Sequence, residues 1–385
     1  MNKMIWGKII VAGSCVALTN ISYAENFKRF SVSAGWMHVM PQGKANPFNI
    51  NSVVDPNKEN GYGIGSISQQ AFLGSIDPDA QLYTGENALD FLPLTFERPG
   101  IGNQSLAQML GALENNDASD DQSYLSNINA STAGSAQLKG IDQWTAQDTG
   151  LEAKNVDTLG LTFNYYLNDH VSLQFIGGIP PKVDIKGKGE IVANMTGEAM
   201  PQGDIAMLFP DGILDLAQDI PITNLGNKKR ASSVRAWTPA MEVQYQFGQS
   251  GVNKFRPFVG AGIMYAYFNE IKLDSTIKQD LVNAGHMIQN ILDDKAGAAL
   301  DGEVSSADTK VRVKTTDAIA PLVTLGATYD INENWFGIAS LSYAKLSNRA
   351  NIDVIDKNTG NKLIRSSTKI DIDPLITYVG VGYRF

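Results

Sequence analysis

The sequence is poor in the residues that carry metal and redox chemistry. Its 385 residues include one cysteine, Cys15, and three histidines, His38, His170 and His286. These counts exclude a disulfide framework and a zinc site built from cysteine and histidine. We therefore expect neither a metal ion nor another cofactor.

Charge is also scarce, and basic charge most of all. Charged residues make up 18% of the chain, and 31 basic residues stand against 40 acidic ones for a net charge of -9. Because no basic cluster could neutralise a phosphate backbone, nucleic acid is not an expected partner. The 36 glycines and an apolar share of 43% exclude a disordered, collagen-like or coiled-coil chain and favour a β-rich protein.

Long apolar runs are missing beyond the first residues of the chain. A short basic start precedes the apolar stretch 9–18, and Ala24 ends a small-residue site of the kind that a signal peptidase reads. The pattern predicts a cleaved signal peptide over residues 1–24 and one mature domain over 25–385. Lipidation at Cys15 is the alternative, although the apolar run before it is short. No later segment is long and apolar enough for a transmembrane helix.

The dominant pattern in the mature chain is alternation with a period of two, which is typical of strands with one apolar face. Eight segments show it, beginning near residues 28, 155, 171, 237, 255, 319, 335 and 375. Short turns at 168–170 and 332–334 alternate with long inserts at 41–154, 186–233 and 270–317. This asymmetry predicts an all-β membrane protein, an eight-stranded antiparallel transmembrane β-barrel with long, partly helical extracellular loops.

Aromatic residues on the apolar face of these strands gather near both ends of the strands, as expected for the two interfaces of a membrane. The set near the turns is Phe30, Tyr245, Phe247, Phe255, Tyr329, Trp335, Tyr383 and Phe385, and the set near the loops is Trp36, Trp237, Tyr265, Tyr267 and Tyr343. A soluble lipocalin-like barrel, with the apolar face turned inward, is the alternative. The other face carries many glycines and few charges, which suits a crowded interior better than a surface in water.

The end of the chain resembles a known family. The stretches IDIDP at 370–374 and VGVGYRF at 379–385 are similar to the C-terminus of the OmpW family of outer-membrane proteins, and blocks at 161–171, 182–187, 254–262 and 334–335 agree. The resemblance implies a small barrel in the outer membrane of a Gram-negative bacterium that admits hydrophobic compounds. It also implies that Tyr383 and Phe385 belong to the signal read by the barrel-assembly machinery. Family members are typically much shorter, so the long inserts stay unexplained.

The residues that alternate with the lipid-facing ones point inward, and they predict the lining of the lumen. Near the long loops it gives an apolar mouth, the expected solute path: Met37, Val39, Ile176, Met264, Phe268, Leu322, Leu346 and Ile376. Toward the turns it gives a polar floor with Glu242, Arg256, Asp330 and Arg384, which can form carboxylate–guanidinium pairs. Because a barrel of this size is filled by side chains or holds one small ligand, no continuous water channel is expected.

Three prolines suggest a second way out of the lumen. Pro180, Pro181 and Pro239 stand near the outer ends of neighbouring strands and cannot donate ladder hydrogen bonds. An interrupted ladder would let a solute leave sideways into the bilayer. The alternative is that the prolines only occupy bulges or the base of a loop.

Two functions stay open on these grounds. The first is passive uptake of small hydrophobic molecules, and the second is a structural or adhesive barrel whose function lies in its loops. We expect helices in the inserts at 105–113 and 277–292, packed as a cap or exposed as an adhesion face. The sequence offers no serine, histidine and carboxylate set, so no enzyme is expected. The expected partners are outer-membrane lipid, lipopolysaccharide, the barrel-assembly machinery and a hydrophobic solute.

Overall fold

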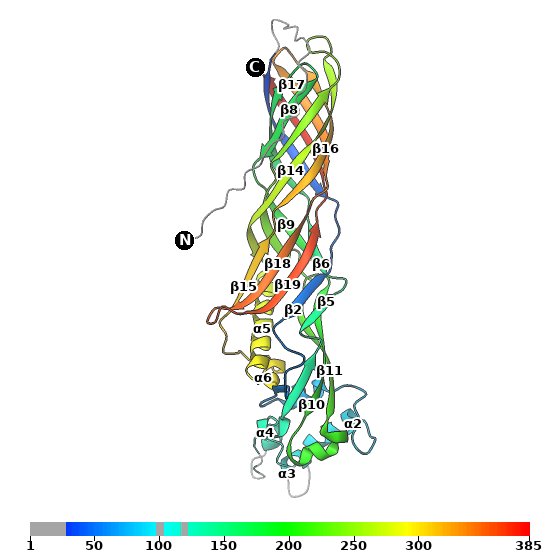
Figure 1. The fold of residues 1–385 in the computed structure, drawn as a ribbon, viewed down its shortest axis with the longest axis vertical. Coiled ribbons are helices and arrows are strands. Elements are labelled where there is room, and N and C mark those ends of the chain that lie inside the picture. The colour runs from blue at the N-terminus through cyan, green and yellow to red at the C-terminus, as the bar shows by residue number, and fades with distance from the viewer. Residues whose placement is uncertain (1–27, 98–103, 116, 118–121) are drawn as a thin grey trace.

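The structure is a computed structural model that describes residues 28–97, 104–115, 117 and 122–385. The signal peptide predicted over 1–24, and Cys15 with it, lie outside the described residues. The chain forms one long body with a barrel at one end, further β-sheets in the middle and a region of short helices at the other end (Figure 1).

Eight strands close the barrel at the end of the molecule that carries the C-terminus. They are β1 (Phe30–Pro41), β7 (Val156–Tyr166), β8 (Val171–Gly178), β13 (Ala240–Gln246), β14 (Phe255–Leu273), β16 (Ala318–Asp330), β17 (Trp335–Ala344) and β20 (Pro374–Arg384). Neighbours pair antiparallel in the order β13-β8-β7-β1-β20-β17-β16-β14, and pairing of β13 with β14 closes the circle. Closure pairs the backbone groups on both edges of the strands over most of the barrel wall, as a hydrocarbon environment demands.

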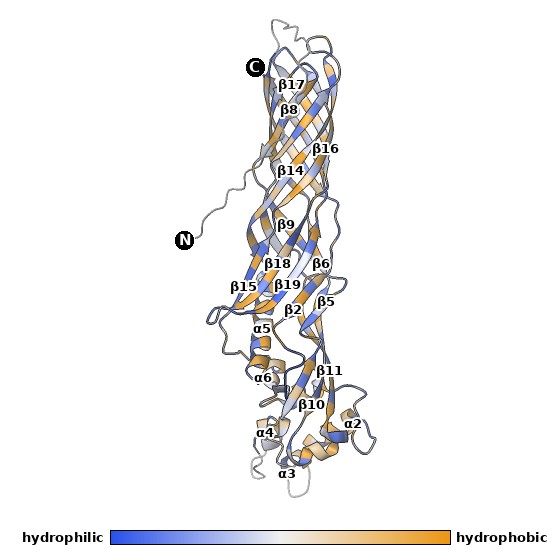
Figure 2. Ribbon diagram, in the orientation of Figure 1, coloured by the Kyte–Doolittle hydropathy of each residue, from blue (hydrophilic) through white to orange (hydrophobic). Residues whose placement is uncertain are grey.

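The apolar parity of the strands faces outward, as the sequence predicts. Val243 and Val379 are 56% and 49% exposed, whereas Glu242, next to Val243 in the chain, is 1% exposed. Every aromatic residue predicted for the two membrane interfaces is among the exposed large side chains. Figure 2 shows apolar and polar residues alternating along the barrel strands. The soluble alternative, which needs these side chains inside, is therefore wrong.

The strands of the barrel continue into two sheets outside it. The outer half of β14 pairs with β12 (Ser232–Trp237), which is followed in the sheet by β9 (Lys182–Lys188) and β6 (Gly150–Ala153). A five-stranded sheet has the order β15 (Thr309–Thr315), β18 (Ser347–Asp356), β19 (Lys362–Asp371), β2 (Phe48–Ser52) and β5 (Gln143–Ala146). Figure 1 shows these strands prolonging the wall of the barrel.

The far end of the molecule, which we call the head, comprises a small sheet and short helices. The sheet has the order β11 (Leu214–Asn224), β10 (Glu190–Met200), β4 (Ser135–Lys139) and β3 (Tyr62–Gly63). The short helices are α1 (Gln69–Ser75), α2 (Ala88–Phe96), α3 (Leu106–Met109), α4 (Ala130–Ala133) and α6 (Ala296–Leu300), with 3-10 turns η2 (Ser123–Leu125), η3 (Gly203–Leu208) and η4 (Pro210–Gly212). The longer helix α5 (Ser275–Leu292) contacts β11 of the head and β15, β18 and β19 of the middle sheet. One hydrophobic core joins the head to the middle sheets.

The inserts are more ordered, and contain more strand, than the sequence indicated. The predicted helix at 277–292 exists as α5, with Ile277 and Ile288 buried, but the one predicted at 105–113 is reduced to the four residues of α3. The hairpin of β18 and β19 falls outside the three predicted inserts. Residues 352–356 of β18 are buried on successive positions, because both faces of the strand are covered. Such strands show no alternation and escape a search for it.

Candidate solute-binding site

A cavity of about 510 Å³ runs from the mouth of the barrel into the sheets beyond it. All residues of the predicted solute path lie on its wall: Met37, Val39, Ile176, Met264, Phe268, Leu322, Leu346 and Ile376. The sheets outside the barrel add further apolar residues to the same wall, among them Phe48, Leu151, Val183 and Val234. The volume falls in the range of about 300–1,000 Å³ that is typical of small-molecule pockets.

The mouth of the barrel is a compact apolar cluster rather than an open funnel. Leu322 and Leu346 are 2% and 1% exposed, and they pack with Met264 and Ile376. Met37, Val39, Ile176 and Phe268 contact this cluster from the side and are partly buried. An apolar molecule placed here would exchange contact with water for contact with aliphatic side chains, which is favourable in proportion to the area buried.

A layer of hydrogen-bonded polar side chains lies in the lumen below the cavity. Gln174 donates to Asn164 at 2.9 Å, Asn164 donates to Gln244 at 3.1 Å, and Gln244 donates to Gln174 at 2.8 Å, which completes a ring. Gln244 and Thr324 both donate to the Glu242 carboxylate at 2.7 Å. Gly260 makes room for this carboxylate, because a Cβ there would lie 2.8 Å from its Oε1 atom.

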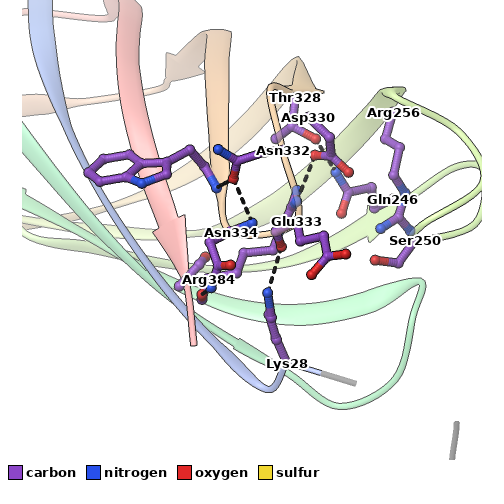
Figure 3. A network of polar contacts seen from close by, with 12 residues as sticks. Lys28, Gln246, Ser250, Arg256, Thr328, Asp330, Asn332, Glu333, Asn334 and Arg384 are labelled. Atoms are coloured by element: carbon purple, nitrogen blue, oxygen red, sulfur yellow. Dashed lines mark hydrogen bonds and ion pairs between the residues drawn. The ribbon is translucent and has the colours of Figure 1, made fainter. Parts of the chain in front are cut away.

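A second polar layer lies at the turn end of the barrel and is drawn in Figure 3. Arg384 pairs with Asp330 at 2.6 Å, and Gln246 donates to Thr328 at 2.7 Å. Arg256 donates to the carbonyl oxygen of Asp169 at 2.5 Å and lies 3.3 Å from its carboxylate.

The structure thus divides the predicted polar floor into separate contacts. Only Asp330 and Arg384 pair with each other, whereas Arg256 binds a residue of the turn before β8. Glu242 lies in the upper layer and meets Thr324 and Gln244 in place of an arginine. Alternation along a strand identifies the residues that face inward. The position of each side chain along the barrel axis decides which partner it meets.

The wall of the cavity is interrupted at the predicted prolines. The ladder between β8 and β13 ends at the pair Ile176 and Ala240, and pairing resumes between β9 and β12 at Lys182 and Arg235. We call the intervening segment 177–181, together with 236–239 opposite it, the side gap. Six residue steps at about 3.3 Å each give it a length of about 20 Å along the chain. Gly177, Ile179, Trp237 and the prolines Pro180, Pro181 and Pro239 all line the cavity here.

The three prolines face different neighbours. Ala236 donates its N–H to the Pro181 carbonyl at 3.0 Å across the side gap, and proline has no N–H to return the bond. Tyr265 of β14 donates to the Pro239 carbonyl at 2.9 Å, so the nitrogen of Pro239 faces β14 and not the gap. The Pro180 carbonyl accepts from the Arg235 guanidinium at 3.3 Å.

Comparison with known proteins relates this chain to one family of outer-membrane proteins. The family model described as OmpW family matches residues 300–385. Outer membrane protein W of Vibrio cholerae is 26% identical over 227 residues, which cover 59% of this chain and 73% of the relative. Outer membrane protein W of Salmonella typhimurium is 25% identical over 236 residues, covering 61% and 76%. The chain is an OmpW-like outer-membrane barrel. It is a protein of the Gram-negative outer membrane.

Solved structures of OmpW-like barrels align along most of the chain. The outer membrane protein OprG from Pseudomonas aeruginosa has a TM-score of 0.45 and 13% identity, covering 93% of this chain and 96% of that one. The E. coli outer membrane protein W has a TM-score of 0.32 and 15% identity, covering 94% and 100%.

The histidines of this OmpW-like chain lie in three separate places. His38 contacts Asp157 at 2.7 Å, His170 contacts the Gln246 carbonyl at 2.9 Å, and His286 contacts Ser305 at 2.9 Å. Within the described ranges, no group of three or more His, Cys, Asp or Glu side chains could hold a metal ion, and no helix there is both long and apolar enough to cross a membrane.

Proposed function

We propose that this OmpW-like barrel takes up small hydrophobic molecules passively through the cavity at its mouth. The observation that carries the proposal is an apolar cavity of about 510 Å³ whose wall includes an unpaired stretch of backbone. The cavity draws its lining from both the barrel and the sheets outside it. A solute could therefore leave water well outside the membrane surface and reach the level of the bilayer without rehydration.

The solute is proposed to leave through the side gap rather than through the floor. The polar ring of Asn164, Gln174 and Gln244 and the paired charges below it offer nothing to an apolar molecule, and opening them would leave buried polar groups without partners. The side gap needs no such rupture over most of its length. Trp237 lines the cavity at the gap and belongs to the outer set of interfacial aromatics, which indicates release near the outer boundary of the bilayer.

The partners follow from this position. Outer-membrane lipid surrounds the apolar outer face, and lipopolysaccharide is the proposed neighbour of the aromatic set near the side gap. Phe385 is 54% exposed at the end of β20, where its N–H donates to the Phe30 carbonyl at 2.9 Å. Together with Tyr383 it is available to the barrel-assembly machinery as the proposed assembly signal.

The alternative, adhesion by the extracellular region, has one observation in its favour. Tyr83 and Met207 of the head are 78% and 73% exposed, and they lie close together because Tyr83 donates its N–H to the Leu208 carbonyl at 2.8 Å. Replacing both by serine should abolish attachment to surfaces if adhesion is the function. The same variant should leave solute uptake unchanged if our proposal is right.

Uptake of a graded series of solutes into proteoliposomes tests the proposal directly. Ala350→Phe places a ring in the cavity, since Ala350 is 3% exposed and lines its wall. Ala261→Phe makes the same change on the exposed face of β14 and serves as the matched control. Uptake of apolar solutes should fall several-fold with Ala350→Phe and hold with Ala261→Phe. Equal uptake by wild type and protein-free vesicles would refute the proposal.

A further inference from the structure

Asn348 carries a buried polar group that the fold leaves without a partner. It lies on β18, lines the cavity and is 7% exposed. Its side-chain oxygen accepts no hydrogen bond in the structure. Buried carboxamides are normally bonded, so an exception calls for an explanation such as a bound ligand.

The neighbours of Asn348 are aliphatic. Leu346, which directly precedes β18, and Ala350, which shares the parity of Asn348 on β18, are 1% and 3% exposed. Ile370 stands opposite it on β19. All three line the cavity with Asn348, so its carboxamide is a polar spot on an apolar stretch of wall.

Three other polar side chains of the cavity wall have partners within the protein. Gln174 belongs to the polar ring below the cavity, Thr158 donates to the Ile179 carbonyl at 2.6 Å, and Ser342 is bonded to Thr324 at 2.8 Å. A water molecule beside Asn348 would be poorly held, because a buried water needs two to four polar partners. A solute that brings its own polar atom on an apolar body meets no such difficulty.

We propose that Asn348 is a specificity-determining residue that binds a hydroxyl group of the solute, so that the preferred solutes are small aliphatic alcohols rather than plain alkanes. This inference rests on the proposed uptake function and deepens it. A hydroxyl group donates to the carboxamide oxygen and can accept from its nitrogen, so either orientation of the amide serves. The aliphatic wall on both sides of Asn348 holds the rest of the molecule by burial of apolar area.

The test is equilibrium binding to the mature barrel in lipid nanodiscs, read by displacement of a fluorescent apolar probe. The solutes are 1-heptanol and n-octane, which have the same number of heavy atoms, and protein-free nanodiscs give the partition baseline. Asn348→Leu removes the amide but keeps the branched shape. Asn351→Leu makes the same change three residues along β18, on the other face of the strand, as the matched control.

We expect Asn348→Leu to weaken heptanol binding about three- to tenfold while octane binding holds or improves, as loss of one neutral hydrogen bond implies. Asn351→Leu should leave both affinities unchanged. Asn348→Val, a smaller apolar replacement, must lower the same heptanol-to-octane ratio, which covers the case in which the leucine variant does not fold.

The outcomes separate this inference from the proposed function. If wild type binds both solutes and the ratio is unchanged in the folded Asn348 variants, the role of Asn348 is refuted and uptake stands. If wild type binds neither solute above the protein-free baseline, the uptake proposal itself fails, and the role of Asn348 fails with it.

Discussion

Restoring one backbone hydrogen bond across the side gap should slow solute release. Ala236 donates to the Pro181 carbonyl at 3.0 Å, and in an antiparallel pair of this kind the partner normally returns a second bond. Proline at 181 cannot do so. Pro181→Val supplies the missing N–H opposite the Ala236 carbonyl, at the end of the side gap that borders the pair Lys182 and Arg235.

The size of the effect follows from the worth of one such bond. A backbone hydrogen bond contributes about 0.5–1.5 kcal/mol net, which lowers the population of an opened gap about two- to twelvefold. Initial uptake of an apolar solute into proteoliposomes should fall by that factor if opening of the gap limits release. The affinity of the cavity for the same solute, measured in nanodiscs, should not change, because no cavity side chain other than residue 181 is altered.

Pro239→Val is the matched control for this prediction. It makes the same chemical change, but the nitrogen at 239 faces Tyr265 of β14 and so cannot bridge the side gap. Its uptake rate should equal that of wild type. The side-exit reasoning is refuted if folded Pro181→Val protein takes up solute at the wild-type rate, or if Pro239→Val slows uptake as much as Pro181→Val does.

Three further predictions concern stability and assembly. Leu346→Ala should cost about 2–5 kcal/mol, because it hollows the fully buried cluster at the mouth; chemical unfolding in lipid vesicles measures it. Val243→Lys should make the free energy of folding into vesicles less favourable by up to about 4 kcal/mol, because it puts a charge on the lipid-facing side of the barrel. The folded fraction, measured on a gel, checks this. Lys58 donates a hydrogen bond of 2.6 Å to the Asp294 carboxylate, and the Gly63 N–H donates another, so the pKa of Asp294 lies below its usual range. The pair of Lys58 and Asp294 therefore stabilises the head near neutral pH. This stabilisation is lost as the pH falls through the lowered pKa of Asp294. Lys58→Met should therefore cost less than about 1 kcal/mol at neutral pH and nothing in strong acid, by thermal unfolding at both pH values.

The barrel could be predicted from the sequence because every second residue of its strands faces lipid and must be apolar. Val243 and Val379 face out, and Met264 and Leu322 face in, for the same reason of strand geometry. The alternation of residues along each strand therefore predicts which barrel side chains line the cavity. It could not identify partners, and Arg256 reaches the turn residue Asp169 while Glu242 stays among amides and hydroxyls.

The middle sheets and the head could not be predicted in the same way. Their strands are covered by other protein on both faces, so apolar residues follow one another, as at Ile352, Val354 and Ile355, and the period of two disappears. Asn348 was missed with the hairpin that carries it. A polar residue between aliphatic neighbours, Leu346 and Ala350 on one parity, was the signal in the sequence that could have found it.

Stability and the proposed uptake depend on different parts of this barrel. At the turn end, paired charges and complete ladders hold the strands, and the ion pair of Arg384 with Asp330 joins neighbouring inward faces at 2.6 Å. At the mouth, the ladder over the side gap is reduced to the bond from Ala236 to Pro181, and the continuous hydrophobic core beyond the gap holds the strand ends. The insert between β9 and β12 then has a structural reason. Because these two strands pair again beyond the gap, they hold its two sides in register while only one backbone bond crosses the gap itself. A shorter chain that ended its strands at the mouth would let the same segments fray.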